Sequence, residues 1–157
     1  GKFRDMFRGA SAITLDSKNR ITIPTRYREE LFADCQGKMI CTVDIQHPCL
    51  LLYPLPEWEE IELKLCNLSS MNPQERLLQQ VLLGNATDCD MDKNGRLLLN
   101  GPLRQHASLE KSVMLVGQLK KFEIWSESAW QAQMQQGISK IQSGEIELTE
   151  RLLDLSL

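Results

Sequence analysis

The chain has 157 residues, of which 42% are apolar and 25% charged, a composition typical of a globular protein with one domain or two compact modules. No stretch approaches the roughly 20 consecutive apolar residues of a membrane-spanning helix, which argues against a helical membrane protein. The formal net charge of −3 excludes a protein that is basic over its whole surface.

The N-terminal part of the chain combines a short leader with a cluster of positive charge. Residues 1–5 precede Met6, a candidate natural start, and we expect them to be an expression remnant without an export signal. Between residues 6 and 28, five basic side chains accompany one acidic side chain, which gives a local charge of +4. Such an asymmetry is expected where one face meets a polyanion, although a random surface can also carry it. The basic residues are Arg8, Lys18, Arg20, Arg26 and Arg28.

The segment after Met6 carries the patterns of strands and one short helix. Apolar residues alternate with polar or small ones at 13–15 and again at 21–23, which indicates two half-buried strands joined by a turn. Pro24 ends the second strand because proline has no N–H group to donate to a ladder. A short helix is predicted at 25–31. Two further apolar strands are predicted at 38–43 and 50–54.

Two helices are predicted in the middle of the chain. Pro56 at a first helical position, followed by three glutamates in the first turn, indicates the start of one helix. Asn72-Pro73 begins another helix, and Gly84 ends it because glycine readily adopts the conformation common at helix C-termini. The Glu- and Leu-rich tail after Gly144 lacks a clear helical pattern. We expect it to be a terminal arm that is ordered only against a neighbour or not at all.

The sequence contains an internal repeat with an offset of 76 residues. Asp16–Ile23 aligns with Asp92–Leu99, so that Asp and Arg fall in register and each Arg precedes a strand-like run. The predicted order of strand, turn, strand, helix, strand, strand and helix is the same in both halves. We therefore predict an α+β fold, mainly β with helices, built from two copies of one module. The expected divisions are 6–57 for the first repeat, 58–84 for a helical bridge, 85–130 for the second repeat and 131–157 for a C-terminal helix and tail.

The repeated segment has the chemistry of a tight turn that presents an arginine. Asp16 can accept hydrogen bonds from backbone N–H groups two residues onward. Asn19 and its counterpart Gly95 are the residue types that most readily adopt positive φ. Arg20 then leaves the turn at a fixed angle, where the aspartate can hold its guanidinium. An arginine presented in this way suits phosphate and the O6/N7 edge of guanine, and Lys18 adds a charge for phosphate.

The second copy repeats these elements in Asp92, Lys93, Gly95 and Arg96. Its surroundings are nearly neutral, so the first turn ranks ahead of it as a contact to DNA. Residue chemistry alone leaves open a salt-bridged hairpin without a ligand, because surface Asp–Arg pairs are common and contribute little stability. The repeat and the basic cluster favour binding, since a purely structural turn needs no additional cations nearby.

Other chemistries have little support in the sequence. His47 and Cys49, with Cys41 nearby, fall short of the four ligands that a zinc site needs. The other histidine, His106, has no nucleophile motif beside it, and there is no glycine-rich phosphate loop. Five cysteines without a C-x-x-C pair indicate reduced thiols in a cytoplasmic protein. We therefore expect no catalytic activity, metal, cofactor or small-molecule substrate.

Several segments together resemble one bacterial protein family, the MraZ family of the AbrB/SpoVT superfamily. The resemblance covers almost the whole chain from Met6, and two degenerate Asp-x-x-x-Arg copies at this spacing are specific, whereas one copy would be weak. The chain departs from the family at Asn19, where glycine is usual. The segments that carry the resemblance are Met6–Ala10, Leu15–Arg28, His47–Trp58 and Leu83–Ala86.

The resemblance implies a double-split, swapped-hairpin β-barrel in which the two repeats pair as a pseudo-dimer, and a homo-oligomeric ring. It also implies a DNA-binding repressor of its own cell-division and cell-wall gene cluster, located at the nucleoid, that binds repeated short G-rich elements of double-stranded DNA. The alternative is a ring-forming interaction scaffold or an antitoxin-like partner with an incidental basic face. The expected DNA contacts are Arg8, Lys18, Arg20, Arg26, Arg28, Lys93 and Arg96, with Asp16, Asn19, Asp92 and Gly95 forming the turns.

Overall fold

The structure is a computed structural model that describes residues 6–157, and the predicted expression remnant at 1–5 lies outside the described residues. The chain forms two compact units, one ending at Glu127 and the other running over Ser128–Leu157. Within residues 6–157, no helix is both long and apolar enough to cross a membrane. The mixture of strands and helices confirms the predicted α+β class.

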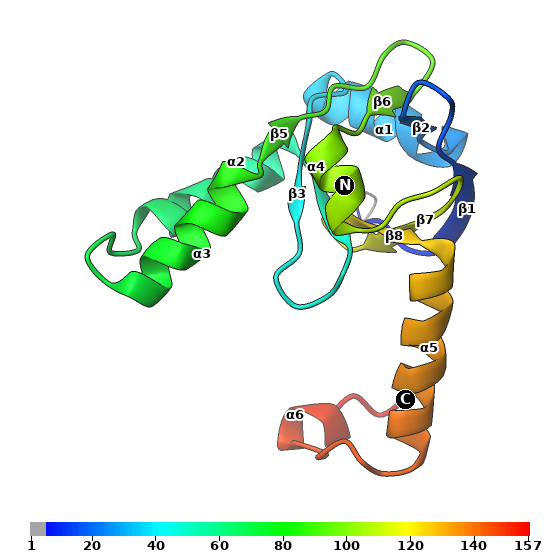
Figure 1. The fold of residues 1–157 in the computed structure, drawn as a ribbon. Helices are drawn as coiled ribbons and strands as arrows, with labels where there is room; N and C mark the ends of the chain where they lie inside the picture. The colour runs from blue at the N-terminus through cyan, green and yellow to red at the C-terminus, as the bar shows by residue number, and fades with distance from the viewer. Residues whose placement is uncertain (1–5) are drawn as a thin grey trace. The chain divides into compact units, whose positions relative to one another are not determined.

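The order of secondary-structure elements repeats in the two halves of the chain (Figure 1). The first half contains β1 (Ala10–Thr14), β2 (Arg20–Thr22), α1 (Thr25–Cys35), β3 (Met39–Val43) and β4 (Leu50–Pro54). The helices α2 (Leu55–Cys66) and α3 (Pro73–Gly84) follow. The second half contains β5 (Thr87–Asp88), β6 (Arg96–Leu98), α4 (Gly101–His106), β7 (Ser112–Gln118), β8 (Lys121–Ser126) and α5 (Glu127–Gln142). The predicted order is confirmed, although α1 extends to Cys35, beyond its predicted end.

The strand pairing in the two sheets is symmetric: it stays the same when the two repeats are exchanged. One sheet has the strand order β1-β7-β8-β4-β3-β5, and the other pairs β2 with β6. Replacing each strand by its equivalent in the other repeat reverses the first order and leaves both sheets unchanged. Backbone bonds follow the same rule, since Ile23 N donates to Gly95 O (2.8 Å) and Leu99 N donates to Asn19 O (3.0 Å). The two repeats are therefore interleaved rather than folded as separate lobes.

The closed barrel that the family resemblance implies is not seen in the strand pairing of residues 6–157. β1 and β5 are the edges of the six-stranded sheet, and they do not pair with each other. The strands that would have to close the barrel are short, since β5 has 2 residues and β2 and β6 have 3 residues each. The observed architecture is an open six-stranded sheet and a separate two-stranded β2–β6 ribbon.

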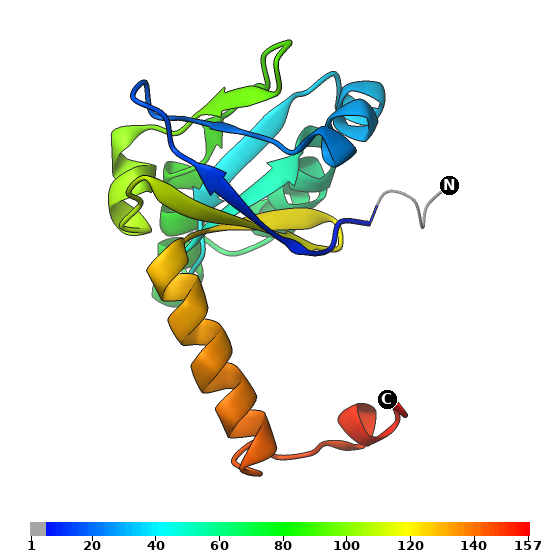
Figure 2. The ribbon, with the colours of Figure 1, turned by 90° about the vertical axis from the view of Figure 1, so that its right-hand side faces the viewer.

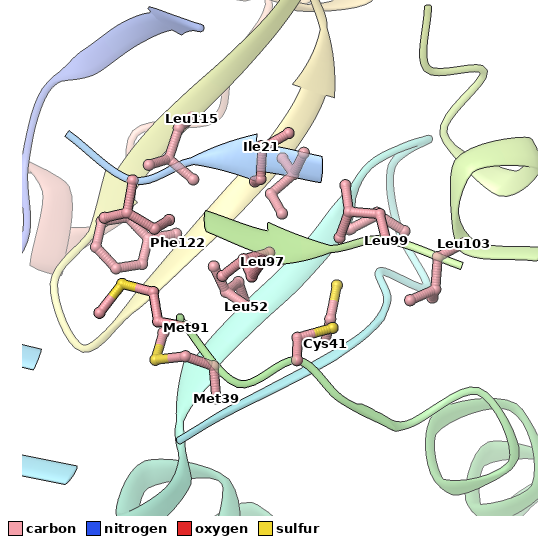
Figure 3. Packing of buried hydrophobic residues seen from close by; sticks show 14 of the residues in the cluster. Ile21, Met39, Cys41, Leu52, Met91, Leu97, Leu99, Leu103, Leu115 and Phe122 are labelled. Atoms are coloured by element: carbon pink, nitrogen blue, oxygen red, sulfur yellow. The ribbon is translucent and has the colours of Figure 1, made fainter. Parts of the chain in front are cut away.

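The β2–β6 ribbon is anchored on one side by the main hydrophobic core. Ile21 and Leu97 are partners in the ribbon register and are 0% and 1% exposed. They belong to the same buried cluster as Leu52, Leu115 and Phe122 of the six-stranded sheet (Figure 3). Full burial of such a side chain contributes about 1.5–3 kcal/mol relative to exposure. The core therefore fixes the ribbon, and the residues that alternate with this buried pair face outward.

α2 begins within one residue of its predicted start at Pro56, and α3 begins and ends at the predicted Pro73 and Gly84. Asn72 Oδ1 accepts hydrogen bonds from Gln74 N (3.0 Å) and Glu75 N (3.1 Å), which satisfies unpaired donors at the start of α3. The side-chain amide of Gln79 donates to Leu65 O (2.9 Å) and so ties α3 to α2. A second buried cluster joins α2 to β3 and β4, and consists of Ile40, Leu51, Tyr53, Trp58 and Leu65.

The second unit contains α5 beyond Glu127 and the short helix α6 (Glu150–Leu153). The sequence predicts no helix in this tail, so α6 is a difference from the expectation. At its start, Thr149 Oγ1 accepts a hydrogen bond from Leu152 N (3.4 Å), which satisfies one unpaired donor of the helix. The large apolar residues of this unit are mostly exposed: Ile138, Ile141, Ile146, Leu148, Leu152, Leu153, Leu155 and Leu157.

Candidate nucleic-acid interface

The first turn, between β1 and β2, is held closed by the side chain of Asp16. Its Oδ1 accepts hydrogen bonds from Lys18 N (2.8 Å) and Arg20 N (2.9 Å), and its Oδ2 accepts one from Arg20 Nε (3.0 Å). Asn19 has a φ of 64°, in the left-handed region that asparagine tolerates better than most residues. The predicted backbone turn and the predicted Asp–Arg contact are both present.

The second turn, between β5 and β6, has the same geometry 76 residues later. Asp92 Oδ1 accepts hydrogen bonds from Asn94 N and Arg96 N, both at 2.9 Å, and its Oδ2 accepts one from Arg96 Nε (3.1 Å). Gly95 has a φ of 78°. Asparagine in one copy and glycine in the other thus meet the same backbone requirement, as the sequence predicts.

Each aspartate orders an arginine without occupying all of its donors. The two carboxylates contact Nε of Arg20 and Arg96, and each guanidinium carries two further NH2 groups that can donate to a ligand. The arginine side chains are 27% and 34% exposed, so they are accessible from outside the fold. The turns therefore present two ordered, positively charged hydrogen-bond donors.

Hydrogen bonding within the turn lowers the pKa of the Asp16 carboxyl below its ordinary value. The backbone N–H of Arg20 is the main cause, and the N–H of Lys18 and the Arg20 side chain add to it, while desolvation acts in the opposite direction. The pKa of Asp92 is lowered in the same way, mainly by the backbone N–H of Arg96. Both carboxyls are therefore ionised acceptors at neutral pH.

We expect the first turn to stay ordered below pH 3.8, the ordinary pKa of aspartate, because the folded-state pKa of Asp16 is depressed. The stability that this group contributes is present at higher pH and is lost as the pH falls through its folded-state pKa. Carboxyl carbon NMR would measure this titration. Arg20→Ala should return the pKa only part of the way, because alanine retains the dominant backbone N–H. Titration of Asp16 at or above 3.8 in the folded protein would contradict the geometry.

The β2–β6 ribbon places both arginines on one face. In its register Arg20 is the partner of Leu98, and Thr22 is the partner of Arg96. Cross-strand partners point to the same side of a sheet, and residues two apart in one strand also share a side. Thr22 and Leu98 are exposed and the arginines are partly exposed. We call these four residues the ribbon face.

The tips of the two turns stand out from the body of the first unit, beside the ribbon, in both views of the molecule (Figures 1 and 2). Each tip carries an exposed lysine, Lys18 in the first turn and Lys93 in the second. The predicted tips are therefore on an open surface of the chain. The ribbon face and the two tip lysines together form the candidate nucleic-acid interface.

Arg28 supports the second turn from the first repeat. Its Nε donates to Ile23 O (2.6 Å). Its side chain lies so close to Gly95 that a Cβ added there would be 2.5 Å from Arg28 Cδ. Arg104, the equivalent of Arg28, donates through Nε to Leu99 O (3.0 Å). The sequence marks Arg28 as a DNA contact, and the structure shows that it also packs against the backbone of the second turn.

Arg8 and Arg26 lie near the start of β1, away from the first turn. Arg26 Nη2 donates to Ser11 Oγ (2.6 Å) and Tyr27 Oη (2.8 Å), and its Cζ lies 4.6 Å from the centre of the Tyr27 ring. The Tyr27 hydroxyl donates to the backbone oxygen of Arg8. Ser11 precedes the first turn by five residues, about 17 Å in an extended strand. The structure therefore divides the basic segment into a turn group and a group at the other end of β1.

One group of potential metal ligands is present among the described residues. Side-chain atoms of Asp44, Cys49 and Glu123 lie within 4.8 Å of one another. Burial and the nearby Asp44 carboxylate raise the pKa of the Cys49 thiol, which donates to Asp44 Oδ2 (3.3 Å). The hydrogen bond from Cys49 Sγ is enough to account for its contact with Asp44. From the sequence, Cys49 is grouped with His47 and Cys41, because Glu123 is remote along the chain; in the structure its neighbours in this group are Asp44 and Glu123.

Sequence reasoning missed two members of the ribbon face, Thr22 and Leu98. Thr22 sits between two buried isoleucines in a regular alternation, which is the signal that could have placed it outside. Leu98 lies within a run of three leucines that hides the alternation. The repeat alignment, which pairs Leu98 with Thr22, is the signal that could have placed it, and the strand register agrees that it is the outward member of that run.

Comparison with known proteins gives consistent matches over almost the whole chain. A family model described as "MraZ protein, putative antitoxin-like" matches the chain twice, at residues 6–81 and 82–154. A transcriptional regulator MraZ of Colwellia psychrerythraea is 91% identical over 152 residues, which are 97% of this chain and 100% of the relative. The proteins of the same name from Pseudoalteromonas atlantica and Salmonella newport are 66% and 60% identical with the same coverage.

These matches agree with the internal repeat, since one family model covers each half of the chain in turn. The relatives match over their whole length, and they are named as transcriptional regulators and not as enzymes. The chain therefore belongs to the MraZ family of transcriptional regulators.

Proposed function

We propose that the chain is a sequence-specific DNA-binding transcriptional regulator that reads the major groove with the ribbon face. The observation that supports this most directly is the pair of arginines, Arg20 and Arg96, each ordered by an aspartate on one exposed face. The major groove of B-DNA is wide enough to admit a two-stranded β-ribbon. The relatives named as transcriptional regulators support the same role.

The chemistry of the ordered arginines fits DNA in two ways. With Nε fixed by the aspartate, the remaining donors of each guanidinium form a fork that can bind guanine O6 and N7, or two oxygens of a phosphate. Lys18 and Lys93 at the exposed tips are placed to contact the phosphate backbone on either side. In this proposal Arg28 positions the second turn and contributes charge. Arg8 and Arg26 supply flanking phosphate contacts.

The finer biological role follows the family resemblance. In this proposal the protein represses its own cell-division and cell-wall gene cluster by binding repeated short G-rich elements, and it resides in the cytoplasm at the nucleoid. Identical subunits assemble into a ring, which presents several ribbon faces and gains affinity where DNA repeats match their spacing. Each subunit keeps the division into repeats 6–57 and 85–130, a bridge 58–84 and a C-terminal part 131–157. In this proposal the interleaving of the two repeats derives from the swapped-hairpin arrangement, with the six-stranded sheet left open between its edges β1 and β5.

The competing function is a protein-binding one. The words "antitoxin-like" in the family description favour a scaffold or antitoxin-like partner as the second candidate. In that case the ribbon face would contact a protein, and the arginines would be incidental to nucleic-acid binding. Salt-dependent binding to DNA distinguishes the two candidates, because counterion release is a property of polyanion binding.

The test is a titration of the protein against duplex DNA from upstream of its own gene, over a range of salt concentrations. Each phosphate contact contributes about 0.9 to the slope of log K against log salt, so Lys18→Ala should reduce the slope by about that amount per bound turn. Duplexes with one, two and four copies of the element should bind with steeply rising affinity. Fluorescence anisotropy measures both quantities.

Arg76→Ala is the matched control for Lys18→Ala, because Arg76 is exposed on α3 and outside the ribbon face. It should leave the salt slope unchanged. Absence of DNA binding by the assembled wild-type protein would defeat the proposed function. Equal affinity for one and four copies would defeat the ring as the source of avidity, while leaving the ribbon as the reader.

A further inference from the structure

The ribbon face contains one large apolar side chain that is not packed in the core. Leu98 is 57% exposed, whereas its sequence neighbours Leu97 and Leu99 are buried in the core. Its cross-strand partner is Arg20, which Asp16 orders in the first turn. An exposed leucine thus lies beside one of the two ordered arginines, within the surface assigned above to DNA.

The internal two-fold is broken at this position. By the offset of 76 residues, Leu98 is equivalent to Thr22, which is the cross-strand partner of Arg96. The aspartates and arginines of the two turns are identical in type and in hydrogen bonding. The two halves of the ribbon face therefore differ in the neighbour of the arginine: leucine beside Arg20 and threonine beside Arg96.

This difference has a chemical meaning in the major groove. Thymine is the base that presents a methyl group there, and apolar side chains recognise it by contact. When the ribbon faces the groove, an outward leucine can contact this methyl group. The contact removes apolar surface of both groups from water. The threonine in the other half offers a single methyl and a hydroxyl, and so a smaller apolar contact.

Building on the proposed function, we propose that Leu98 is a specificity-determining residue that packs on the C5 methyl group of a thymine next to the site bound by Arg20. The positive charge of Arg20, Arg96 and Lys18 around Leu98 selects DNA as the occupant of this face over an apolar protein partner. Because Thr22 makes the smaller contact, the two halves read different base pairs. The ribbon therefore binds its DNA element in one orientation only.

The experiment replaces each thymine of the element in turn with uracil, which removes the methyl group and keeps the base pairing. Wild-type affinity should fall about fourfold for each bound ribbon at one thymine position, the change expected for loss of one buried methyl group. Leu98→Ala should bind the unmodified thymine duplex with the same reduced affinity. It should also be insensitive to uracil at the same position.

Leu63→Ala is the matched control, since Leu63 is 66% exposed on α2, outside the ribbon face. It should keep wild-type affinity and wild-type sensitivity to uracil. Wild-type protein that binds the element but responds to uracil at no thymine would overturn this inference and leave the proposed function standing. So would a Leu98→Ala variant that keeps full sensitivity, even if its assembly changes in native mass spectrometry. Loss of all DNA binding by the wild type would instead overturn the proposed function, and this inference with it.

Discussion

Replacing Arg20 and Arg96 together with alanine is expected to weaken specific DNA binding at least about 30-fold. Each arginine that binds a base edge with two donors contributes about 1–3 kcal/mol of discrimination, and the two contributions act on the same ribbon. Alanine also leaves the Asp16 and Asp92 carboxylates without their guanidinium partners on a surface that faces phosphates. Both effects lower affinity, so the double variant should show the largest binding defect of any exposed pair in the chain.

The contributions of charge and geometry can be separated at Arg20. Arg20→Lys keeps the positive charge but loses the fork of parallel donors. It should retain salt-dependent binding to unrelated DNA and lose preference for the element. Of the single alanine variants, Arg20→Ala should be the more damaging, because the first turn lies in the more basic segment. Fluorescence anisotropy with specific and scrambled duplexes measures these differences.

The double variant should remain folded, because its side chains contribute little to the core. Both arginines are partly exposed, and exposed ion pairs contribute at most about 1 kcal/mol. A thermal midpoint lowered by no more than about 8 °C and unchanged assembly would therefore accompany the loss of binding. Retention of wild-type affinity by the folded double variant would exclude the ribbon face as the DNA reader.

The turns were predictable from sequence because their geometry is set by adjacent residues. An aspartate that accepts backbone hydrogen bonds, a residue that tolerates positive φ and an arginine four positions after the aspartate specify the same turn twice. The element order was predictable for a similar reason, since Pro24, Pro56 and Asn72-Pro73 act locally on strand and helix ends. Local chemistry of this kind does not depend on how the repeats pair.

What the sequence did not reveal depends on contacts between the repeats. The packing of Arg28 on Gly95 crosses from one repeat to the other, and no local pattern encodes it. The pairing of Leu98 with Arg20 also joins the two repeats, and the run of three leucines hides the outward position of Leu98 from the local pattern. The basic segment appeared as one cluster along the chain, but β1 separates Arg8 from the first turn. Distance along a strand, which composition ignores, accounts for that difference.

Gly117→Ala is expected to destabilise the first unit by about 1–3 kcal/mol, the usual range for adding atoms to a packed site. Gly117 lies in β7, and its N–H donates to Gly9 O (2.8 Å). A Cβ on Gly117 would be 2.7 Å from Arg8 Cα, which is backbone and cannot move aside as a flexible side chain would. To relieve this clash, the chain around Phe7 would have to shift. The Phe7 ring opposes such a shift because it is buried and stacked on the Phe122 ring, with the ring centres 4.3 Å apart. Urea denaturation measures the loss.

Gly137→Ala provides the opposite case with the same chemical change. Within the described residues, no atom other than those of its own helix backbone and chain neighbours lies within 4 Å of a Cβ at this position in α5. Alanine should therefore favour the helix by up to about 1 kcal/mol. Equal effects of the two substitutions would contradict a steric clash between a Cβ on Gly117 and the backbone of Arg8. Because β1 leads from this contact to the first turn, Gly117→Ala should also speed amide hydrogen exchange in β1 more than in α3.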